Sequence, residues 1–356
     1  MKIALDATPL TVASGGVRRY VEELSRAVAQ NFPEDEYWLV SDQKFELSAE
    51  AMPNLRSGVG PKNALERRWW SFGLNRELAR LDVDVFHGTD FSVPYRAARP
   101  SVMTLHDLSP WMEPSWHQGS SRVRARTPKL LRLGLATMVI TPSEAVRRGA
   151  IDYFQLPGDR VIAVPLAASG HFRPVTASRT GHPYFLYVGT LEPRKNLGLL
   201  LDVWREVRKS YDVDLVLAGR RRSDFQEIPA EAGLRVLGYT SEEELPRLYS
   251  SALAVIYPTH YEGFGLPVLE AMQCGAVVIA SRDPAIAEVA GDHAILLDVR
   301  DRLAWVETCL AVLAKPEFAG NMRERAQMRA SEFSWSKTAK RTREVYGQAV
   351  QRFTQT

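Results

Sequence analysis

Cysteine is scarce in this chain of 356 residues, which contains only Cys274 and Cys309. Both lie in apolar stretches typical of helices, so we expect two buried free thiols and no disulfide framework. Long hydrophobic runs are also lacking, since no apolar stretch approaches the ~20 residues that a membrane-spanning helix needs. The segment Met1–Asp6 is a short strand halted by a charge, not a signal peptide. The expected location is the cytoplasm.

Net charge is almost absent too. The chain has 45 Lys and Arg against 42 Asp and Glu, a balance of +3 that gives no reason to expect nucleic acid as a partner. Cys/His spacing of the zinc-binding kind is missing. Two Asp-Val-Asp strings, Asp82–Asp84 and Asp212–Asp214, precede predicted strands at their amino ends, where ligand chemistry is not expected. We therefore predict no required metal and no cofactor.

Short apolar segments alternate with amphipathic helical patterns twice along the chain. Strands are predicted at residues 2–6, 37–40, 83–87, 102–106, 138–141 and 161–164, then at 184–188, 215–218, 235–237, 254–257, 277–280 and 295–297. Helices are predicted near 17–28, 64–81, 121–135 and 144–154, then near 196–210, after 241, from 267, and near 302–314, 317–330 and 336–353. This alternation predicts an α/β protein with two doubly wound parallel sheets.

A polar, proline-bearing stretch between residues 168 and 183 separates the two series and is the natural linker. We expect a first Rossmann-like domain over residues 1–170 and a second over residues 171–334. Open α/β sheets bind ligands beyond the carboxyl ends of their strands, so the loops at those ends are the candidate sites.

The segment Glu262–Glu270 follows the predicted strand 254–257 at its carboxyl end. Gly263 and Gly265 let the backbone turn and approach a ligand closely, and Pro267 suits the first turn of a helix. The amides of Phe264, Gly265 and Leu266 would then project from a helix N-terminus, a favourable place for phosphate or sugar oxygens. Glu262 precedes the turn and Glu270 lies one turn into the helix, where its two oxygens suit the vicinal diol of a ribose.

Charged and polar side chains follow other predicted strands in the same way. Arg194 and Lys195 come after strand 184–188, where a guanidinium fork and an ammonium point charge both suit a phosphate group. His106 ends strand 102–106 and is followed by Asp107, so we interpret it as a functional histidine. Gly15 and Gly16 precede a helix after the first strand but do not form a dinucleotide-binding fingerprint.

Five segments together resemble glycosyltransferase family 4, a large family of retaining enzymes. Glu262–Glu270 is similar to its E-x7-E signature and Tyr187–Leu197 to its donor-phosphate loop. Val102–Leu108 resembles its catalytic-histidine strand end, Ser14–Val17 its N-terminal glycine loop, and Phe333–Trp335 the start of its last helix. The resemblance covers nearly the whole chain. It implies the GT-B fold, with two Rossmann-like domains facing across a cleft. The first domain would receive the acceptor and the second would bind the donor, and a last helix (residues 335–356) would pack back on the first domain.

The resemblance also implies roles for single residues. His106 hydrogen-bonds the donor sugar, Glu262 holds that sugar and stabilises developing positive charge, and the amide of Gly16 faces the donor diphosphate. We expect base contacts from the loop at Gly238. The form of the phosphate loop is similar to a subset rich in mannosyl- and rhamnosyltransferases. It therefore favours a nucleotide sugar, GDP-mannose, as donor for a glycan or lipid-linked acceptor in surface polysaccharide or glycolipid synthesis.

Two basic segments in the first half have alternative interpretations. Arg67–Trp70 combines two arginines with two tryptophans, and five cations lie between Arg122 and Arg132. They are either solvated helix faces with core tryptophans or a patch for an anionic lipid headgroup, which would add peripheral contact at the inner face of a membrane. His87-Gly88 and Trp111 are further candidate acceptor contacts.

Two other functions stay open on the sequence alone. A nucleotide-sugar 2-epimerase shares this two-domain architecture, but it needs additional acid/base groups and no second-sugar site. A non-catalytic nucleotide-sugar-binding subunit has no need of His106, Arg194, Lys195, Glu262 and Glu270 together.

Overall fold

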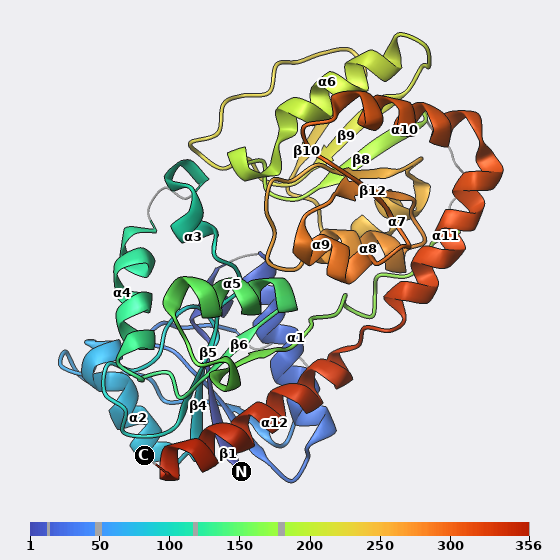
Figure 1. The fold of residues 1–356 in the computed structure, drawn as a ribbon. Helices are drawn as coiled ribbons and strands as arrows, with labels where there is room; N and C mark the ends of the chain where they lie inside the picture. Colours follow the sequence, from blue (N-terminus) through green and yellow to red (C-terminus); the bar gives the residue numbers. More distant parts are fainter. Residues whose placement is uncertain (13–14, 47–51, 117–119, 177–181, 356) are drawn as a thin grey trace. The chain divides into compact units, whose positions relative to one another are not determined.

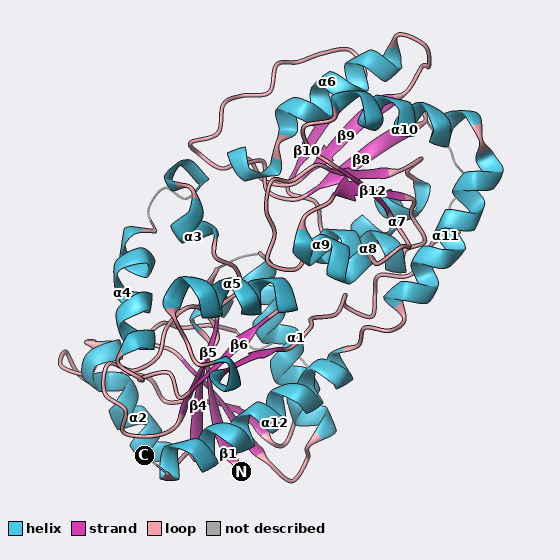
Figure 2. Cartoon of the chain, viewed as in Figure 1, coloured by secondary structure: helices cyan, strands magenta, loops and turns pink. Residues whose placement is uncertain are grey.

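The computed structural model describes residues 1–12, 15–46, 52–116, 120–176 and 182–355 (Figure 1). Contacts divide the chain into two compact units. The first comprises Met1–Trp111, Gly119–Leu166 and Ser334–Thr356, and the second comprises Met112–Gln118 and Ala167–Phe333. Each unit is a parallel sheet with helices packed on it, as Figure 2 shows by secondary structure.

The sheet of the first unit has seven strands in the order β3-β2-β1-β4-β5-β6-β7, all parallel. They are β1 Lys2–Asp6, β2 Glu36–Val40, β3 Leu55–Ser57, β4 Val85–Gly88, β5 Ser101–Thr104, β6 Met138–Thr141 and β7 Val161–Ala163. Six confirm predicted strands, while β3 was not predicted because three residues at a sheet edge leave too short a pattern. The strand predicted to run through His106 was wrong at its end, since β5 stops at Thr104.

The helices of the first unit largely follow the predicted periodicity. They are η1 Thr8–Thr11, α1 Gly16–Asn31, the π-helical turn η2 Trp69–Gly73, α2 Leu74–Leu81, α3 Ser109–Met112, α4 Ser121–Arg132, α5 Glu144–Phe154, η4 Gly158–Arg160 and α12 Trp335–Thr354. Ser143 caps α5 by accepting a hydrogen bond from the amide of Val146 at 3.1 Å, as predicted. Helix α12 packs on α1 and on strands β4, β5 and β6.

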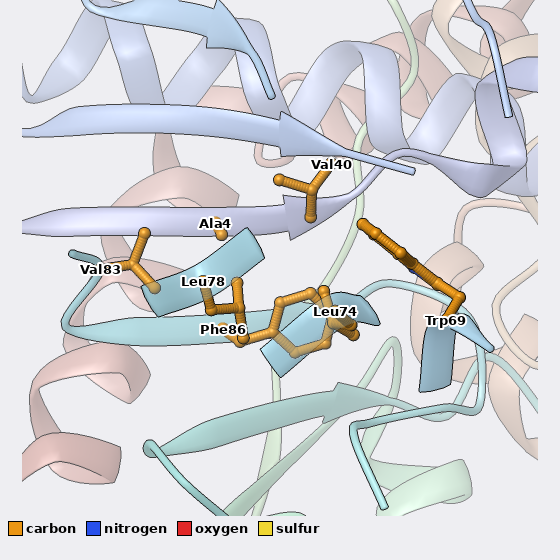
Figure 3. Packing of buried hydrophobic residues seen from close by; sticks show 7 residues of the cluster. All are labelled: Ala4, Val40, Trp69, Leu74, Leu78, Val83 and Phe86. Carbon is orange, nitrogen blue, oxygen red and sulfur yellow. The ribbon is translucent and has the colours of Figure 1, made fainter. Parts of the chain in front are cut away.

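Part of the first unit's core lies beneath α2 (Figure 3). Its buried members are Ala4, Val40, Trp69, Leu74, Leu78, Val83 and Phe86. Leu74 and Leu78 are four residues apart, so both face the sheet from one side of the helix. Trp69 is only 3% exposed. This tryptophan of the basic segment Arg67–Trp70 is therefore a core residue, as the first of the two interpretations predicts.

The sheet of the second unit has six parallel strands in the order β10-β9-β8-β11-β12-β13. They are β8 Tyr184–Val188, β9 Asp214–Ala218, β10 Leu234–Gly238, β11 Val255–Tyr257, β12 Val278–Ser281 and β13 Ile295–Leu297, all predicted. Its helical segments are η3 Pro114–Trp116, η5 Pro193–Lys195, α6 Leu197–Arg208, α7 Leu245–Ser251, α8 Leu266–Gln273, α9 Pro284–Ala290, α10 Arg302–Ala314 and α11 Pro316–Ala330.

In both sheets the strand order reverses beside the first strand of the unit. The chain moves outward from β1 to β3 and then returns to the other side of β1 with β4; it does the same from β8 to β10 and back to β11. Such a switch point leaves a crevice at the carboxyl ends of the two inner strands, where α/β sheets bind ligands. In the second unit those ends carry the loops after Val188 and after Tyr257.

Candidate functional site

The loop after β8 is shaped by two backbone positions in the left-handed region. Gly189 has φ +150°, and a Cβ there would lie 2.9 Å from the hydroxyl of Tyr187. Asn196 has φ +54° between η5 and α6, a conformation that asparagine adopts more readily than most residues. The short helix between these two positions places Arg194 and Lys195 together.

The loop after β11 ends at a glycine that the turn requires. Gly265 has φ +95° at the N-cap of α8, and a Cβ there would lie 3.3 Å from Cγ1 of Ile286. Helix α8 begins at Leu266, one residue before the predicted start, with Pro267 in its first turn. Pro267 has no N–H, and the amides of Val268 and Leu269 both donate to the carbonyl oxygen of Gly265. The side chain of Phe264 is buried and packs edge-on against Phe333.

The two loops meet through a buried cluster of charges. One oxygen of Glu262 accepts a hydrogen bond from Nζ of Lys195, and the other lies 3.2 Å from a guanidinium nitrogen of Arg194. Arg194 also donates to Glu192 at 2.9 Å and to the carbonyl oxygen of Tyr261 at 2.7 Å. All four ionisable side chains are 7–11% exposed. Two cations and two carboxylates thus neutralise each other at the switch point.

The pKa values follow from burial and from this pairing. Burial alone would raise the pKa of the Glu262 carboxyl, but the charges of Lys195 and Arg194 hold it at about 2. Burial lowers the pKa of the Lys195 ammonium, and the neighbouring Glu262 carboxylate opposes that shift. The ionised form of Glu262 is therefore stabilised by its two cationic partners.

Two neighbours of Glu262 were missed by the sequence analysis. Asp283 accepts from the amide of Glu262 at 3.2 Å while it caps α9 through the amides of Ala285 and Ile286. Burial raises the pKa of Asp283 to about 6. Tyr257 accepts a hydrogen bond from Lys195 at 2.9 Å. The Asp283-Pro284 pair does signal a helix start, but no sequence pattern connects it with a loop 21 residues earlier.

The remaining predicted residues of the second unit lie at the same edge of the sheet. Glu270 is 1% exposed in α8 and accepts from the hydroxyl of Tyr249 at 3.0 Å. Gly238 ends β10 with φ +68°. The next residue, Tyr239, is 56% exposed and lies under the guanidinium of Arg220 at 4.6 Å. The ring of Tyr239 is thus an exposed aromatic surface beside the carboxyl ends of β9 and β10.

His106 lies in the first unit, two residues beyond β5. Its Nε2 is 2.7 Å from the carbonyl oxygen of Thr89, and its ring stands edge-on to Tyr20 at 4.9 Å. A carbonyl only accepts, so Nε2 carries the proton and Nδ1 is the acceptor of the neutral ring. Asp107 caps the following turn by accepting from the amide and hydroxyl of Ser109.

The structure describes the glycine loop of the first unit from Gly15 onward. Gly15 has φ +140° and is the N-cap of α1, and Gly16 is the first residue of that helix. Added Cβ atoms at either glycine would meet nothing within 4 Å. The space around both backbones is therefore open. Ser14 lies outside the described residues.

A hollow of about 1040 Å³ adjoins the carboxyl ends of β1, β2 and β3 in the first unit. Two loops of its wall are held by buried or half-buried ions. Arg18 donates to the carbonyl oxygens of Leu10 and Val12, and Glu77 accepts from the amide of Val59 at 2.6 Å. Side chains of mixed character line the hollow: Thr11, Asp42, Lys44, Phe45, Ser57 and Arg67.

Within the described residues, no group of three or more His, Cys, Asp or Glu side chains is arranged to hold a metal ion. In the same part of the chain, no helix combines the length and the apolar character needed to cross a membrane.

Comparison with known proteins gives a family. Residues 14–168 match the family described as Glycosyltransferase Family 4, and residues 170–329 match the family described as Glycosyl transferases group 1. The chain is 33% identical over 284 residues to O-antigen chain mannosyltransferase B of Escherichia coli, a match that covers 74% of each chain. The chain belongs to glycosyltransferase family 4.

Solved structures show that this glycosyltransferase has the GT-B fold. Sucrose-phosphate synthase from Thermosynechococcus elongatus matches it with a TM-score of 0.75 at 19% identity, over 98% of both chains. HepE from Anabaena, in complex with UDP-glucose, matches with a TM-score of 0.70 at 17% identity, over 98% of this chain and 100% of that one. The two parallel α/β units of this glycosyltransferase are the two Rossmann-like domains of that fold.

The interpretation of His87 as an acceptor contact was wrong. Its side chain is fully buried, with Nδ1 2.8 Å from the hydroxyl of Tyr346 in α12 and Nε2 2.7 Å from Oγ1 of Thr104. Strand neighbours face opposite sides of a sheet. Phe86 packs beneath α2, so His87 points toward α12 instead. Burial lowers the pKa of His87 to about 3, with His106 adding to the shift. In this glycosyltransferase His87 therefore fixes the last helix.

Trp111, the other candidate acceptor contact, is half-buried. Its indole nitrogen donates to the carbonyl oxygen of Arg124 at 3.3 Å, and its ring stands edge-on to Phe91 and Phe154. The ring is thus one member of an aromatic group in the first unit.

Proposed function

We propose that this glycosyltransferase transfers a hexose with retention of the anomeric configuration. The donor is a nucleoside diphosphate sugar, GDP-mannose, and the acceptor a glycan or lipid-linked glycan of a surface polysaccharide. The observation that carries the proposal is the Glu262–Arg194–Lys195 cluster at the switch point of the second sheet. The mannosyl donor is supported by the similarity to an O-antigen chain mannosyltransferase, and the nucleotide sugar by the UDP-glucose in the HepE complex.

The cluster suits bond breaking in a sugar nucleotide. A nucleoside diphosphate gains negative charge as the glycosidic bond breaks, and prearranged cations in a water-poor site stabilise that charge. Arg194 provides a planar fork for phosphate oxygens and Lys195 a point charge. Glu262 holds both cations in place before the donor binds, so little rearrangement accompanies the reaction. We propose that the charge of these cations replaces that of a metal ion.

We also propose roles for the other predicted residues of the two units. Glu262 also stabilises the positive charge that develops on the sugar, and Glu270 binds the ribose. The amides of Phe264, Gly265 and Leu266, together with Gly15 and Gly16, take phosphate and sugar oxygens. Gly238 contacts the base, and His106 accepts a hydrogen bond at Nδ1 from a hydroxyl group of the donor sugar. No protein nucleophile is assigned: the departing phosphate takes the proton of the acceptor hydroxyl on the same face of the sugar.

The hollow of the first unit is our candidate site for the acceptor glycan. It combines hydroxyl, carboxylate, cationic and apolar side chains, the mixture that an oligosaccharide with polar edges and apolar faces requires. Lys44 and Arg67 add positive charge that suits a lipid-linked diphosphate. Peripheral contact with an anionic membrane is the alternative role of Arg67.

One assay tests the proposal. The protein is incubated with GDP-mannose, UDP-glucose and other nucleotide sugars, with and without lipid-linked glycans, and release of the nucleoside diphosphate is measured. We expect release from GDP-mannose that rises with acceptor, an α-linked product by NMR, and no loss of activity in EDTA. An epimerised donor without sugar transfer would contradict the proposal and show that the protein is an epimerase. Tight binding of a nucleotide sugar without turnover would show that it is a binding subunit.

Two variants locate the site in the same assay. Glu262→Gln should lose at least ~100-fold in kcat at saturating donor, because charge stabilisation specific to the transition state is lost. Glu270→Gln should mainly raise the donor KM. Glu227→Gln is the control, since Glu227 is 87% exposed and pairs with Arg221 at the surface. Wild-type kinetics of both site variants would show that the site lies elsewhere.

A further inference from the structure

A short segment from the first half of the chain packs with the second unit. The chain leaves the first unit after Trp111, contributes residues Met112–Gln118 to the second unit, and returns at Gly119. Within this segment, the carbonyl oxygens of Trp116 and Ser115 both accept hydrogen bonds from the guanidinium of Arg222. Arg222 lies in the loop after β9, so a single side chain fastens this segment to the edge of the second sheet.

The same guanidinium reaches the charge cluster. Arg222 lies 3.3 Å from one oxygen of Glu192, whose other oxygen accepts from Arg194 at 2.9 Å. Asp224 binds Arg222 from the outer side with both of its oxygens. The Glu192 carboxylate therefore lies between two arginines, one that holds Trp116 and one that holds Glu262.

The indole of Trp116 provides a second connection to Arg194. Its ring is nearly parallel to those of His260 and Tyr261, with interplanar angles of 9° and 16°. The amide of His260 donates to the carbonyl oxygen of Arg194 at 2.9 Å, and the carbonyl oxygen of Tyr261 accepts from its guanidinium at 2.7 Å. The two residues that Trp116 stacks on are thus the ones that hold Arg194 on its other side.

We propose that Arg222 is a positioning residue for transfer. It clamps the Met112–Trp116 segment onto the Glu192 side of the cluster and thereby sets the orientation of Arg194. The inference rests on the proposed function, in which Arg194 stabilises the leaving diphosphate. Without Arg222, the Glu192 carboxylate loses one of its two arginine partners and interacts more strongly with Arg194. Trp116 also loses the hydrogen bond that holds it over His260 and Tyr261.

The test compares Arg222 with its neighbour. Arg221 makes similar surface contacts, to the carbonyl oxygen of Phe225 and to exposed Glu227, but does not touch Glu192. We expect Arg222→Ala to lower kcat about 10- to 100-fold, the size of loss that a displaced charged group causes. The donor KM should change less than threefold. Arg222→Lys should recover only part of the rate, because an ammonium cannot span two carbonyls and two carboxylates. Arg221→Ala should stay within twofold of wild type.

A double-mutant cycle separates positioning from folding. Trp116→Ala should lower kcat like Arg222→Ala, and the double variant should be no slower than the worse single variant, because both remove the same clamp. Multiplying effects, or a lowered melting temperature with wild-type kcat, would overturn the inference. If Arg222→Ala keeps wild-type kcat while Glu262→Gln is inactive, the positioning role of Arg222 is refuted and the proposed site is retained. If Glu262→Gln also keeps its activity, the proposed function itself fails.

Discussion

Each buried charge in the cluster is compensated by an oppositely charged neighbour. Glu262 is the shared counter-ion of Lys195 and Arg194, and all three side chains are at most 11% exposed. Removing one member of a buried ion pair leaves the other charge without compensation and costs about 3–5 kcal/mol. A variant of Glu262 therefore changes stability as well as turnover.

We predict that Glu262→Gln lowers the free energy of unfolding by about 3–5 kcal/mol, while Glu262→Gln with Lys195→Met loses less, because the second change removes one of the stranded cations. Urea unfolding followed by circular dichroism measures both. The double variant should remain without transferase activity. A double variant less stable than Glu262→Gln would show that Lys195 is not paired chiefly with Glu262.

Residues in this cluster differ in how far the sequence predicts them. The sequence predicts Arg194, Lys195 and Glu262 because each lies in the loop after a recognisable strand, within a family motif. Their mutual pairing was not predicted, since the prediction aimed both cations at a phosphate and Glu262 at a sugar. Asp283 and Arg222 were missed because each interacts with a loop distant in sequence, and only the folded sheet brings such loops together.

Helix α8 starts at a position that only glycine adopts without strain. Gly265 has φ +95°, and an added Cβ would lie 3.3 Å from Ile286. We predict that Gly265→Ala lowers the free energy of unfolding by about 1–3 kcal/mol and displaces the helix N-terminus that we assign to ligand oxygens. The control is Gly320→Ala in α11, where nothing lies within 4 Å. It should raise stability by about 0.5–1 kcal/mol. Equal effects of the two changes in thermal unfolding would contradict the strain argument.

Helix α12 is attached to the first sheet by a histidine that is neutral when folded. The pKa of His87 is lowered to about 3, whereas histidine in an unfolded chain titrates near ~6.5. Between these values the unfolded chain binds a proton that the folded chain does not. Wild type therefore loses stability through His87 as pH falls from ~6.5 toward 3, by up to about 1.4 kcal/mol per pH unit.

We predict that the stability advantage of wild type over His87→Asn shrinks with that slope between pH 6.5 and 4. Urea unfolding at a series of pH values measures it. Asp6 and Asp283, whose pKa values burial raises to about 7 and about 6, act in the opposite direction. Both are present in the two proteins and cancel in the difference. A pH-independent difference would mean that His87 is protonated in the folded state.

Elements with strong periodicity were predicted well, and those with short or broken patterns were not. The six strands of the second sheet and the cap at Ser143 were confirmed. The helix predicted near 64–81 instead forms the π-helical turn η2 followed by α2. Gly73 explains the irregular turn: an added Cβ there would lie 1.8 Å from the carbonyl oxygen of Glu66, so the backbone is locally crowded. Close backbone approach of this kind leaves no periodic signal.

At the scale of the whole molecule, GDP should report which loops bind the donor. We predict that GDP at 100 times its Kd stabilises the protein by about 2.7 kcal/mol and slows amide exchange in the loops after β8 and β11. Hydrogen exchange read by mass spectrometry measures the protection of residues 189–196 and 259–266. Protection at the start of α1 would support the role proposed for Gly15 and Gly16. Its absence there would contradict that role, and unchanged exchange in both loops would contradict the donor site.

The division of the chain has a consequence for synthesis on the ribosome. The first unit contains strands β1 to β7, which precede most of the second unit in the chain, yet it also contains α12, which is made after the whole of the second unit. Every residue of the second unit precedes Ser334. Domains generally fold as units while the chain is being made. We therefore expect the second unit to complete its fold first, while the first unit stays incomplete, with His87 uncovered, until α12 has left the exit tunnel.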